Sequence, residues 1–188
     1  MSLPTSQHLV LSIPTLTSER LVLRPPVKGD FENVAAFFAD SERSWGFGGP
    51  LGRNEAWRWF ASMIGHWALR GFGWWMVDTR DGQPAGFVGL WEPEGWPEPE
   101  LGWVMFPGTE GKGYAFEAAT EARRYAYDVL GFETLSSNII PGNTRSIALA
   151  KRLGAHYERS YENVTHGTEW VYRHPAPEAL KQRADDST

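Results

Sequence analysis

Apolar and polar residues alternate along several short segments of this chain, which is 188 residues long. Such alternation is typical of strands with one buried face, and it occurs at residues 20–25, 74–79, 85–91, 100–106, 135–140, 157–164 and 170–173. Asp81-Gly82 predicts a tight hairpin turn between the second and third segments, and the last two segments turn back near His166-Gly167. We therefore predict seven strands.

Between these segments, apolar residues recur every three or four positions, which predicts helices. One helix follows Asp30, which suits an N-cap, and another opens at Asn54. The clearest helix covers 111–130, where one face carries mainly alanine, and a short helix covers 143–153. Because alanine side chains are small, the long helix should pack closely on a sheet. The resulting order is β, α, α, β, β, β, α, β, α, β, β.

A chain of this length predicts one domain, which we place at 16–174 between a flexible N-terminal segment at 1–15 and a polar C-terminal tail at 175–188. The absence of cysteine excludes disulfides, zinc–thiolate and iron–sulfur centres, and a cysteine nucleophile. No apolar run is long enough to span a membrane and no signal-peptide pattern opens the chain, so we expect a cytoplasmic protein without a membrane partner. The 18 basic and 23 acidic residues disfavour nucleic acid and leave room for a cationic substrate.

Ten tryptophans are the unusual part of the composition. Indole combines a large apolar area with one N–H donor, so these residues are either core anchors or the walls of a partly exposed aromatic pocket or dimer face. If they form a dimer face, the protein is a homodimer.

The most informative segment is the turn between the strand at 100–106 and the long helix, where Gly111, Lys112 and Gly113 occur together. Free backbone N–H groups and the positive end of the helix dipole coincide there, so a phosphate or pyrophosphate is the natural ligand. Tight packing of a glycine-rich turn is the alternative. Two nucleotide motifs fail on spacing, because Phe106 stands where a P-loop needs its first glycine and Phe116 where a dinucleotide-binding turn needs its third.

Residues on both sides of this turn resemble the acyl-CoA motif of the GCN5-related N-acetyltransferase (GNAT) superfamily, in particular of the group that includes the ribosomal-protein N-terminal acetyltransferases. The matching residues are Glu100 to Met105, Gly111 to Ala115, Glu117 and Ala118, and a second signature matches at Asn143, Ser146, Lys151, Leu153 and Gly154. The order of elements agrees from Leu16 to Arg173, so the resemblance covers most of the chain.

The resemblance implies an α/β (α+β) fold with a mixed, mostly antiparallel central sheet of about seven strands and helices on both faces. The strands at 100–106 and 135–140 would splay apart and form an acyl-CoA cleft. The resemblance also implies acetyl-CoA as the acyl donor and no metal. The pantetheine arm would bond to the backbone of Trp103, Val104 and Met105. The pyrophosphate would meet the amides of Glu110, Gly111, Lys112, Gly113, Tyr114 and Ala115.

The second signature gives roles to two residues. Asn143 would face the pantetheine arm, and its alternative role is that of a simple N-cap. Ser146 would lie near the sulfur, and its alternative role is that of a small packing residue. Two positions depart from the family pattern. The carboxylate of Glu110 would repel the pyrophosphate if it turned inward, and we expect it to point away. Ala150 replaces the tyrosine that protonates the leaving thiolate in many relatives, which leaves Ser146 or a water molecule for that catalytic role.

Glu100 is the candidate general base for direct attack of an amine on the thioester in a ternary complex, since relatives often carry a carboxylate at the start of this strand. A merely solvated acid is the alternative. Glu92, Glu94 and Glu98 would form with Glu100 an acidic rim that attracts an amine, unless 91–99 is only a solvated, proline-rich loop.

We therefore predict an N-acetyltransferase that moves an acetyl group from acetyl-CoA to a primary amine, on a protein N-terminus or a small molecule. A non-catalytic acyl-CoA-binding module of the same fold is the alternative, and the failed motif spacings disfavour a nucleotide-binding enzyme. The acceptor should be selected by residues 40–53, the second helix and the last hairpin, whose contacts the sequence does not show.

Overall fold

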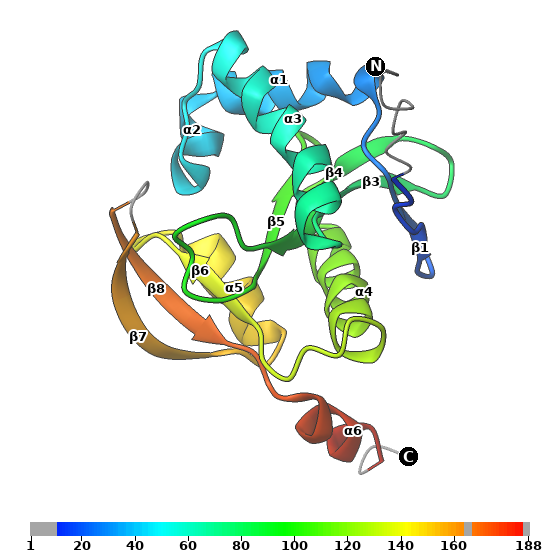
Figure 1. The fold of residues 1–188 in the computed structure, drawn as a ribbon, viewed down its shortest axis with the longest axis vertical. Coiled ribbons are helices and arrows are strands. Elements are labelled where there is room, and N and C mark those ends of the chain that lie inside the picture. Colours follow the sequence, from blue (N-terminus) through cyan, green and yellow to red (C-terminus); the bar gives the residue numbers. More distant parts are fainter. Residues whose placement is uncertain (1–10, 164–166, 186–188) are drawn as a thin grey trace, which may run out of the picture.

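The computed structural model describes residues 11–163 and 167–185 of the chain. Within these ranges the strands form one sheet in the order β1-β2-β3-β4-β5-β6-β8-β7 (Figure 1). Every neighbouring pair is antiparallel except β5 and β6, which are parallel. The strands are β1 (Leu16–Thr17), β2 (Leu21–Arg24), β3 (Trp74–Thr79), β4 (Pro84–Trp91), β5 (Glu100–Met105), β6 (Ser136–Ile139), β7 (His156–Asn163) and β8 (Gly167–Arg173).

The seven predicted strands are confirmed. The additional strand, β1, has two residues and is too short to leave an alternating pattern. His166, which we placed in the last hairpin turn, lies outside the described residues.

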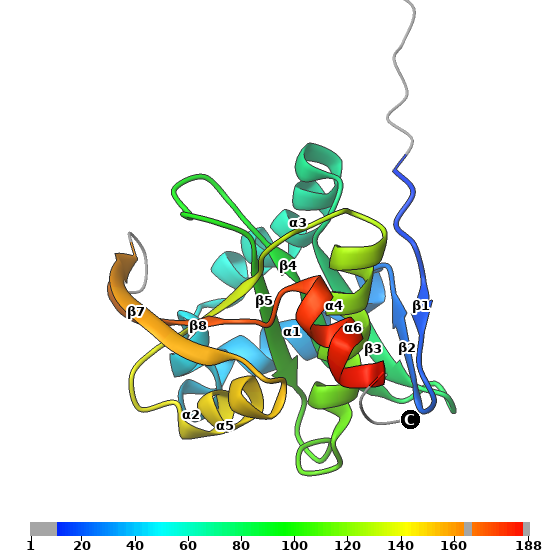
Figure 2. The same ribbon diagram turned by 90° about the horizontal axis from the view of Figure 1, so that it is seen from below.

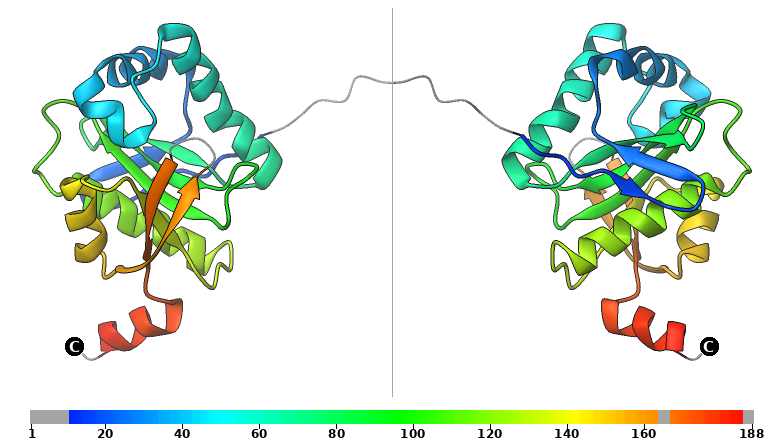
Figure 3. Two further views of the ribbon diagram at one scale, coloured as in Figure 1. Left: turned by 90° about the vertical axis from the view of Figure 1, so that its left-hand side faces the viewer. Right: turned by 90° about the vertical axis from the view of Figure 1, so that its right-hand side faces the viewer.

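The helices cover both faces of the sheet, as predicted (Figure 3). Those near the N-terminus gather above the sheet in Figure 1, and α4 and α5 lie below it. The helices are α1 (Phe31–Ala39), α2 (Ser41–Ser44), α3 (Arg53–Arg70), α4 (Tyr114–Asp128), α5 (Thr144–Arg152) and α6 (Pro177–Asp185), with short 3-10 turns η1 (Lys28–Asp30) and η2 (Trp45–Phe47). None of the helices in the described ranges is long and apolar enough to cross a membrane.

Two apolar clusters hold these layers together. Under α4, four alanines of the predicted face are fully buried against β2 to β5 together with the large side chain of Trp75: Ala118, Ala119, Ala122 and Ala126. Ala115 and Val129, expected on the same face, are partly exposed and exposed, respectively. On the opposite face, α1 and α3 bury Phe38 and Met63 against Trp74 and Phe87 of the sheet. Each such large side chain contributes roughly 1.5–3 kcal/mol on burial, so both helical layers are fixed to the sheet by packing.

Three local features differ from the sequence-based expectation. Helix α4 begins at Tyr114 rather than at 111, because Gly111 and Gly113 have left-handed φ angles of 73° and 82° that end any helical run. Asp30 does precede α1, but its carboxylate accepts hydrogen bonds from Arg24 and from the Val27 amide instead of capping the helix.

The third difference lies at the chain ends. The polar tail contains α6, and Leu180 packs against the cluster under α4 (Figure 2). At the other end, Leu11 and Ile13 pack on the same cluster, and the carbonyl of Pro14 accepts a 2.8 Å hydrogen bond from Trp75 Nε1. The expected flexibility of residues 1–10 concerns a segment outside the described residues.

The sheet is interrupted at its centre. Whereas β4 and β5 pair along their whole length, β5 and β6 pair only at Glu100 and Ser136 and then diverge. The splayed strands expected from the sequence are therefore present.

A buried chain of hydrogen bonds links β5 to β6 at the end where these two strands pair. Arg123 donates to Nδ1 of His174 (3.2 Å), Nε2 of His174 donates to Ser137 (3.0 Å), and Ser137 donates to the carbonyl of Leu101 (2.6 Å). Burial, together with the charges of Arg123 and Arg173, lowers the pKa of His174 to about 3, so the ring is neutral and can both accept and donate.

Candidate active site

Two hollows meet where β5 and β6 separate. The larger, called here the groove, has a volume of about 1030 Å³ and runs between β5, the start of α4 and the start of α5. The smaller, called here the cavity, has a volume of about 350 Å³ and lies between α3, the 91–96 loop and β8. Five residues line both hollows: Gly46, Phe47, Trp103, Asn143 and Ser146.

Most of the residues expected to bind the cofactor line the groove. They are Trp103, Val104, Met105, Glu110, Gly111, Gly113, Tyr114, Ala115, Asn143 and Ser146. Lys112 differs, because its side chain is exposed and does not line the groove, while its carbonyl accepts a 3.0 Å hydrogen bond from Arg20.

The edge of β5 along the groove carries free backbone groups. The carbonyl of Leu101 bonds across the gap to Ser137, and Phe106 donates to Ala85 on the other side. Backbone groups point to alternate sides along a strand, so the N–H and C=O of Trp103 and Met105 face the gap. A polar chain lying in the groove can pair with them as a further strand would.

The far end of the groove is suited to an anion. The first N–H groups of α4 follow the left-handed Gly113, at the positive end of the helix dipole. Three arginines that sequence reasoning missed also line the groove: Arg43, Arg145 and Arg152. The Arg152 guanidinium lies 4.3 Å from the ring centre of Phe116, which holds it at the groove wall.

Glu110 lies among these groups, but its charge is compensated. Its carboxylate accepts hydrogen bonds from Arg43 and from the Gly108 amide. Partial burial acts to raise the pKa of Glu110, but these hydrogen bonds and the Arg43 charge outweigh it and hold the pKa below its usual value. The carboxylate is thus ionised and turned towards Arg43.

Asn143 and Ser146 stand at the junction of the groove and the cavity. Asn143 caps α5, as its Oδ1 accepts the Ser146 amide at 3.2 Å, so the N-cap alternative is correct as a structural role. A Cβ at Gly46 would lie 2.5 Å from Nδ2 of Asn143, so a larger residue there would displace the Asn143 side chain. Ala150, on the same helix, is fully buried in the cluster that contains Ile139.

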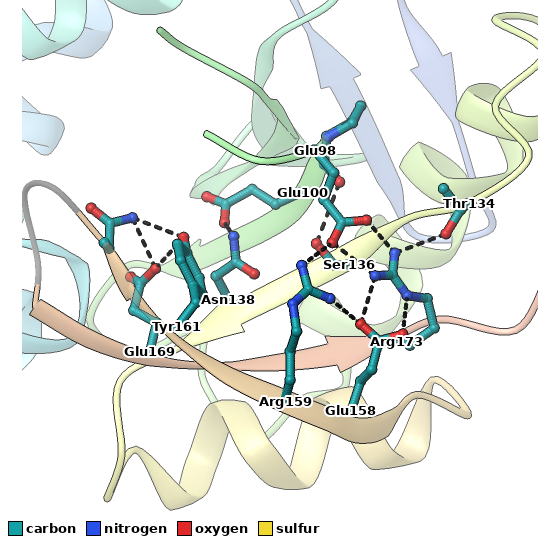
Figure 4. Close-up of polar contacts among 12 residues, drawn as sticks. Glu98, Glu100, Thr134, Ser136, Asn138, Glu158, Arg159, Tyr161, Glu169 and Arg173 are labelled. Atoms are coloured by element: carbon teal, nitrogen blue, oxygen red, sulfur yellow. Dashed lines mark hydrogen bonds and ion pairs between the residues drawn. The ribbon is translucent and has the colours of Figure 1, made fainter. Parts of the chain in front are cut away.

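Glu100 lines the cavity at the point where β5 and β6 still pair. Its carboxylate accepts a hydrogen bond from Asn138 (Figure 4), and Asn138 Oδ1 has no hydrogen-bond partner among the described residues. Burial is the main cause that raises the pKa of Glu100 to about 8, and the charge of Glu169 adds to the rise, whereas hydrogen bonds from Trp96 and Asn138 oppose it. A carboxyl group with this pKa can take up and release a proton near neutral pH.

Glu169 is a site residue that sequence reasoning missed. It is buried on β8 and lines the same cavity as Glu100. Its carboxylate accepts hydrogen bonds from the Tyr161 hydroxyl (2.8 Å) and from Asn163 (2.9 Å), as Figure 4 shows. No local sequence signal marks it, because its place depends on the register of the β7–β8 hairpin.

The acidic rim expected between 92 and 100 is only partly present. Glu98 is bound by Arg159 and Arg173 (Figure 4), and Glu92 lies 3.6 Å from Arg70. These arginines come from distant elements, so the sequence around the loop could not reveal them. Only Glu94 and Glu100 of the four glutamates line the cavity.

Aromatic rings form the remaining walls of the cavity. They belong to Phe47, Trp59, Trp74, Trp91, Trp96 and Trp103. Trp91 stacks on His66 with 4.4 Å between ring centres, and His66 is itself held by the Phe72 carbonyl and the Glu92 amide. His66 thus has a structural role. In the described part of the chain, no group of three His, Cys, Asp or Glu side chains is arranged to hold a metal ion.

Comparisons with known proteins agree with this geometry. The chain is 37% identical to an acetyltransferase from Agrobacterium tumefaciens strain C58, whose crystal structure covers 91% of this chain and 99% of its own with a TM-score of 0.81. It is 31% identical over 72 residues to the uncharacterized N-acetyltransferase YnaD of Bacillus subtilis, which is 38% of this chain. This chain spans about half the length of the curated relatives it matches, 56% and 42%.

A more distant structure shares the fold alone. The spermidine N-acetyltransferase of Vibrio cholerae, solved with CoA and spermine, is 18% identical and covers 87% of this chain and 99% of its own with a TM-score of 0.70. The model of the acetyltransferase (GNAT) domain family matches residues 20–156, most of the chain. Enzymes with this domain use acetyl-CoA as the acyl donor, and this chain belongs to the GNAT acetyltransferase family.

Proposed function

We propose that this chain transfers an acetyl group from acetyl-CoA to a primary amine, with the donor in the groove and the amine in the cavity. The observation that carries the proposal is the meeting of the two hollows at Trp103, Asn143 and Ser146. Two substrates that enter from opposite sides would bring their reacting atoms together there, which is the main requirement for direct transfer.

The residues of the groove fit the parts of acetyl-CoA. The free backbone groups of Trp103 and Met105 suit the amides of the pantetheine arm, and the start of α4 with Arg145 and Arg152 suits the phosphates. Acetyl-CoA supplies the acetyl group as an activated thioester. The Met105 amide faces the gap and is placed to stabilise negative charge on the thioester oxygen.

Glu100 would accept the proton of the amine. An alkylammonium has a pKa of about 10.4, so moving its proton to an ordinary glutamate costs roughly 8 kcal/mol, but to a group with a pKa of about 8 it costs roughly 3 kcal/mol. The raised pKa therefore makes Glu100 a better base. Ser146, at the junction, would donate a proton to the departing sulfur, the role that Ala150 cannot fill.

Three finer assignments are part of the proposal. The motif at 100–118 supports placement near the ribosomal-protein N-terminal acetyltransferases, and the catalytic domain would occupy 16–174. The lack of cysteine is compatible with work in the cytoplasm. Trp45 and Trp57, each 43% exposed, are candidates for a homodimer face.

A thiol-release assay with acetyl-CoA and a panel of primary amines tests the proposal, and calorimetry measures acetyl-CoA binding in parallel. We expect binding, and CoA release that depends on the amine. Binding without release for any amine would favour the non-catalytic acyl-CoA module, and absence of binding would reject both functions.

A further inference from the structure

The walls, charges and size of the cavity indicate what kind of acceptor it binds. Its aromatic walls form a connected set, in which the ring centres of Phe47 and Trp59 are 5.6 Å apart, those of Trp59 and Trp91 6.4 Å, and those of Trp74 and Trp91 6.0 Å. Rings packed in this way keep a fixed shape, since each side chain limits the rotamers of the next. The walls therefore suit an apolar body rather than a hydrated chain.

The ionisable side chains that line the cavity are all acidic. Glu94, Glu100 and Glu169 line it, and no lysine, arginine or histidine does so among the described residues. Arg159 and Arg173, on β7 and β8, are bound to Glu98 and Glu158 and do not line the cavity. An ammonium group is thus favoured by the carboxylates and by the faces of the rings, whereas a carboxylate would meet only like charges.

The size of the cavity sets a third limit. At about 350 Å³ the cavity is much smaller than the groove, so it suits a compact acceptor better than the first residues of a peptide.

We infer that the acceptor is a compact primary amine with an apolar, ring-bearing body and no acid group. This inference rests on the proposed function, because it assigns the cavity to the acceptor. It excludes free α-amino acids, whose carboxylate would lie next to Glu100 and Glu169. It also excludes a protein N-terminus as the acceptor.

The test compares matched acceptors. 2-Phenylethylamine and phenylalanine differ only by a carboxylate, and butylamine lacks the ring. We expect kcat/KM for 2-phenylethylamine to exceed that for phenylalanine by at least about 100-fold and that for butylamine by at least about tenfold. Spermidine and a short peptide with a free N-terminus should also be poor acceptors. Equal values for phenylalanine, or higher values for the peptide, would overturn the inference while leaving acetyl transfer intact.

A charge variant sharpens the test. Glu94→Lys places a cation on the exposed rim of the cavity, so it should narrow the ratio between 2-phenylethylamine and phenylalanine by about tenfold or more. Glu133→Lys makes the same charge change at an exposed position outside both hollows and should leave the ratio unchanged. Equal effects of the two variants would argue against a charge-selective cavity.

Direct binding separates this inference from the proposed function. Quenching of tryptophan fluorescence reports occupancy of the cavity without turnover, because five of its walls are indoles. Quenching by 2-phenylethylamine but not by phenylalanine, with no acetyl transfer, would support the cavity assignment and reject only the chemistry. Quenching by neither compound would reject the assignment.

Discussion

The groove and the cavity are built in different ways. The groove is formed by three continuous segments, 37–47, 103–116 and 142–152, and the middle segment offers a ligand backbone groups and a helix start. The cavity is formed by single side chains from α3, β3, β4, the following loop, β5, β6 and β8. A backbone site leaves a motif in the sequence, because glycines must stand at fixed spacing. A site of converging side chains leaves none.

The largest expected effect comes from the cavity. Glu100→Gln should lower kcat by about 10³, within the 10² to 10⁴ typical of a general base, with unchanged acetyl-CoA affinity by calorimetry. In the native protein, kcat/KM should rise with pH up to about 8 as Glu100 ionises, and the variant should lose this inflection. Glu94→Gln is the control variant and should keep the inflection in its pH profile. A native-like pH profile in Glu100→Gln would remove Glu100 from the mechanism.

Acetyl-CoA binding in the groove should instead be sensitive to a change in backbone conformation. Gly113→Val forces a β-branched residue into a left-handed φ of 82° at the start of α4 and should weaken acetyl-CoA binding at least tenfold, about 1.4 kcal/mol. Gly131→Val is the matched control, because Gly131 has a φ of 72° and lies outside both hollows. Calorimetry should show weaker binding only for the first variant. Equal losses in both would mean that strain, not the phosphate site, is responsible.

The cavity should also affect folding stability. The pKa of Glu100 is higher in the folded protein than in the unfolded chain, so the folded state holds its proton more tightly. Stability from this group is present at low pH and is lost as pH rises from about 4.5 to about 8. The Tm of Glu100→Gln should therefore rise relative to the native protein across this window and stay level above it. A pH-independent difference in Tm would contradict the raised pKa.

The smallest effect is expected at the groove. Glu110→Gln should change acetyl-CoA affinity by less than about threefold, or roughly 0.65 kcal/mol, because Arg43 and the Gly108 amide already compensate the carboxylate. Titration calorimetry measures this difference. A tenfold gain would show that the carboxylate repels the cofactor despite Arg43.

The same contrast explains what the sequence could predict. The strands and the alanine face of α4 follow from periodic burial, which a single segment records. Helix α6 escaped prediction because it has no periodic apolar face, and a partly buried side chain, Leu180, packs it against the core. Glu98 was assigned to an acidic rim, but Arg159 and Arg173 neutralise it from β7 and β8.

The segments expected from the sequence to select the acceptor do line the cavity. Residues 40–53, α3 and the last hairpin supply Phe47, Trp59 and Glu169 to the cavity. Which side chains face inward could not be predicted, because this depends on strand register and on helix packing across the sheet.

The single pairing between β5 and β6 divides the sheet into two halves, one of β1 to β5 and one of β6, β8 and β7. Glu100 belongs to the first half and Glu169 to the second. Because the charge of Glu169 helps to raise the pKa of Glu100, the acid strength of Glu100 depends on how the two halves of the sheet meet.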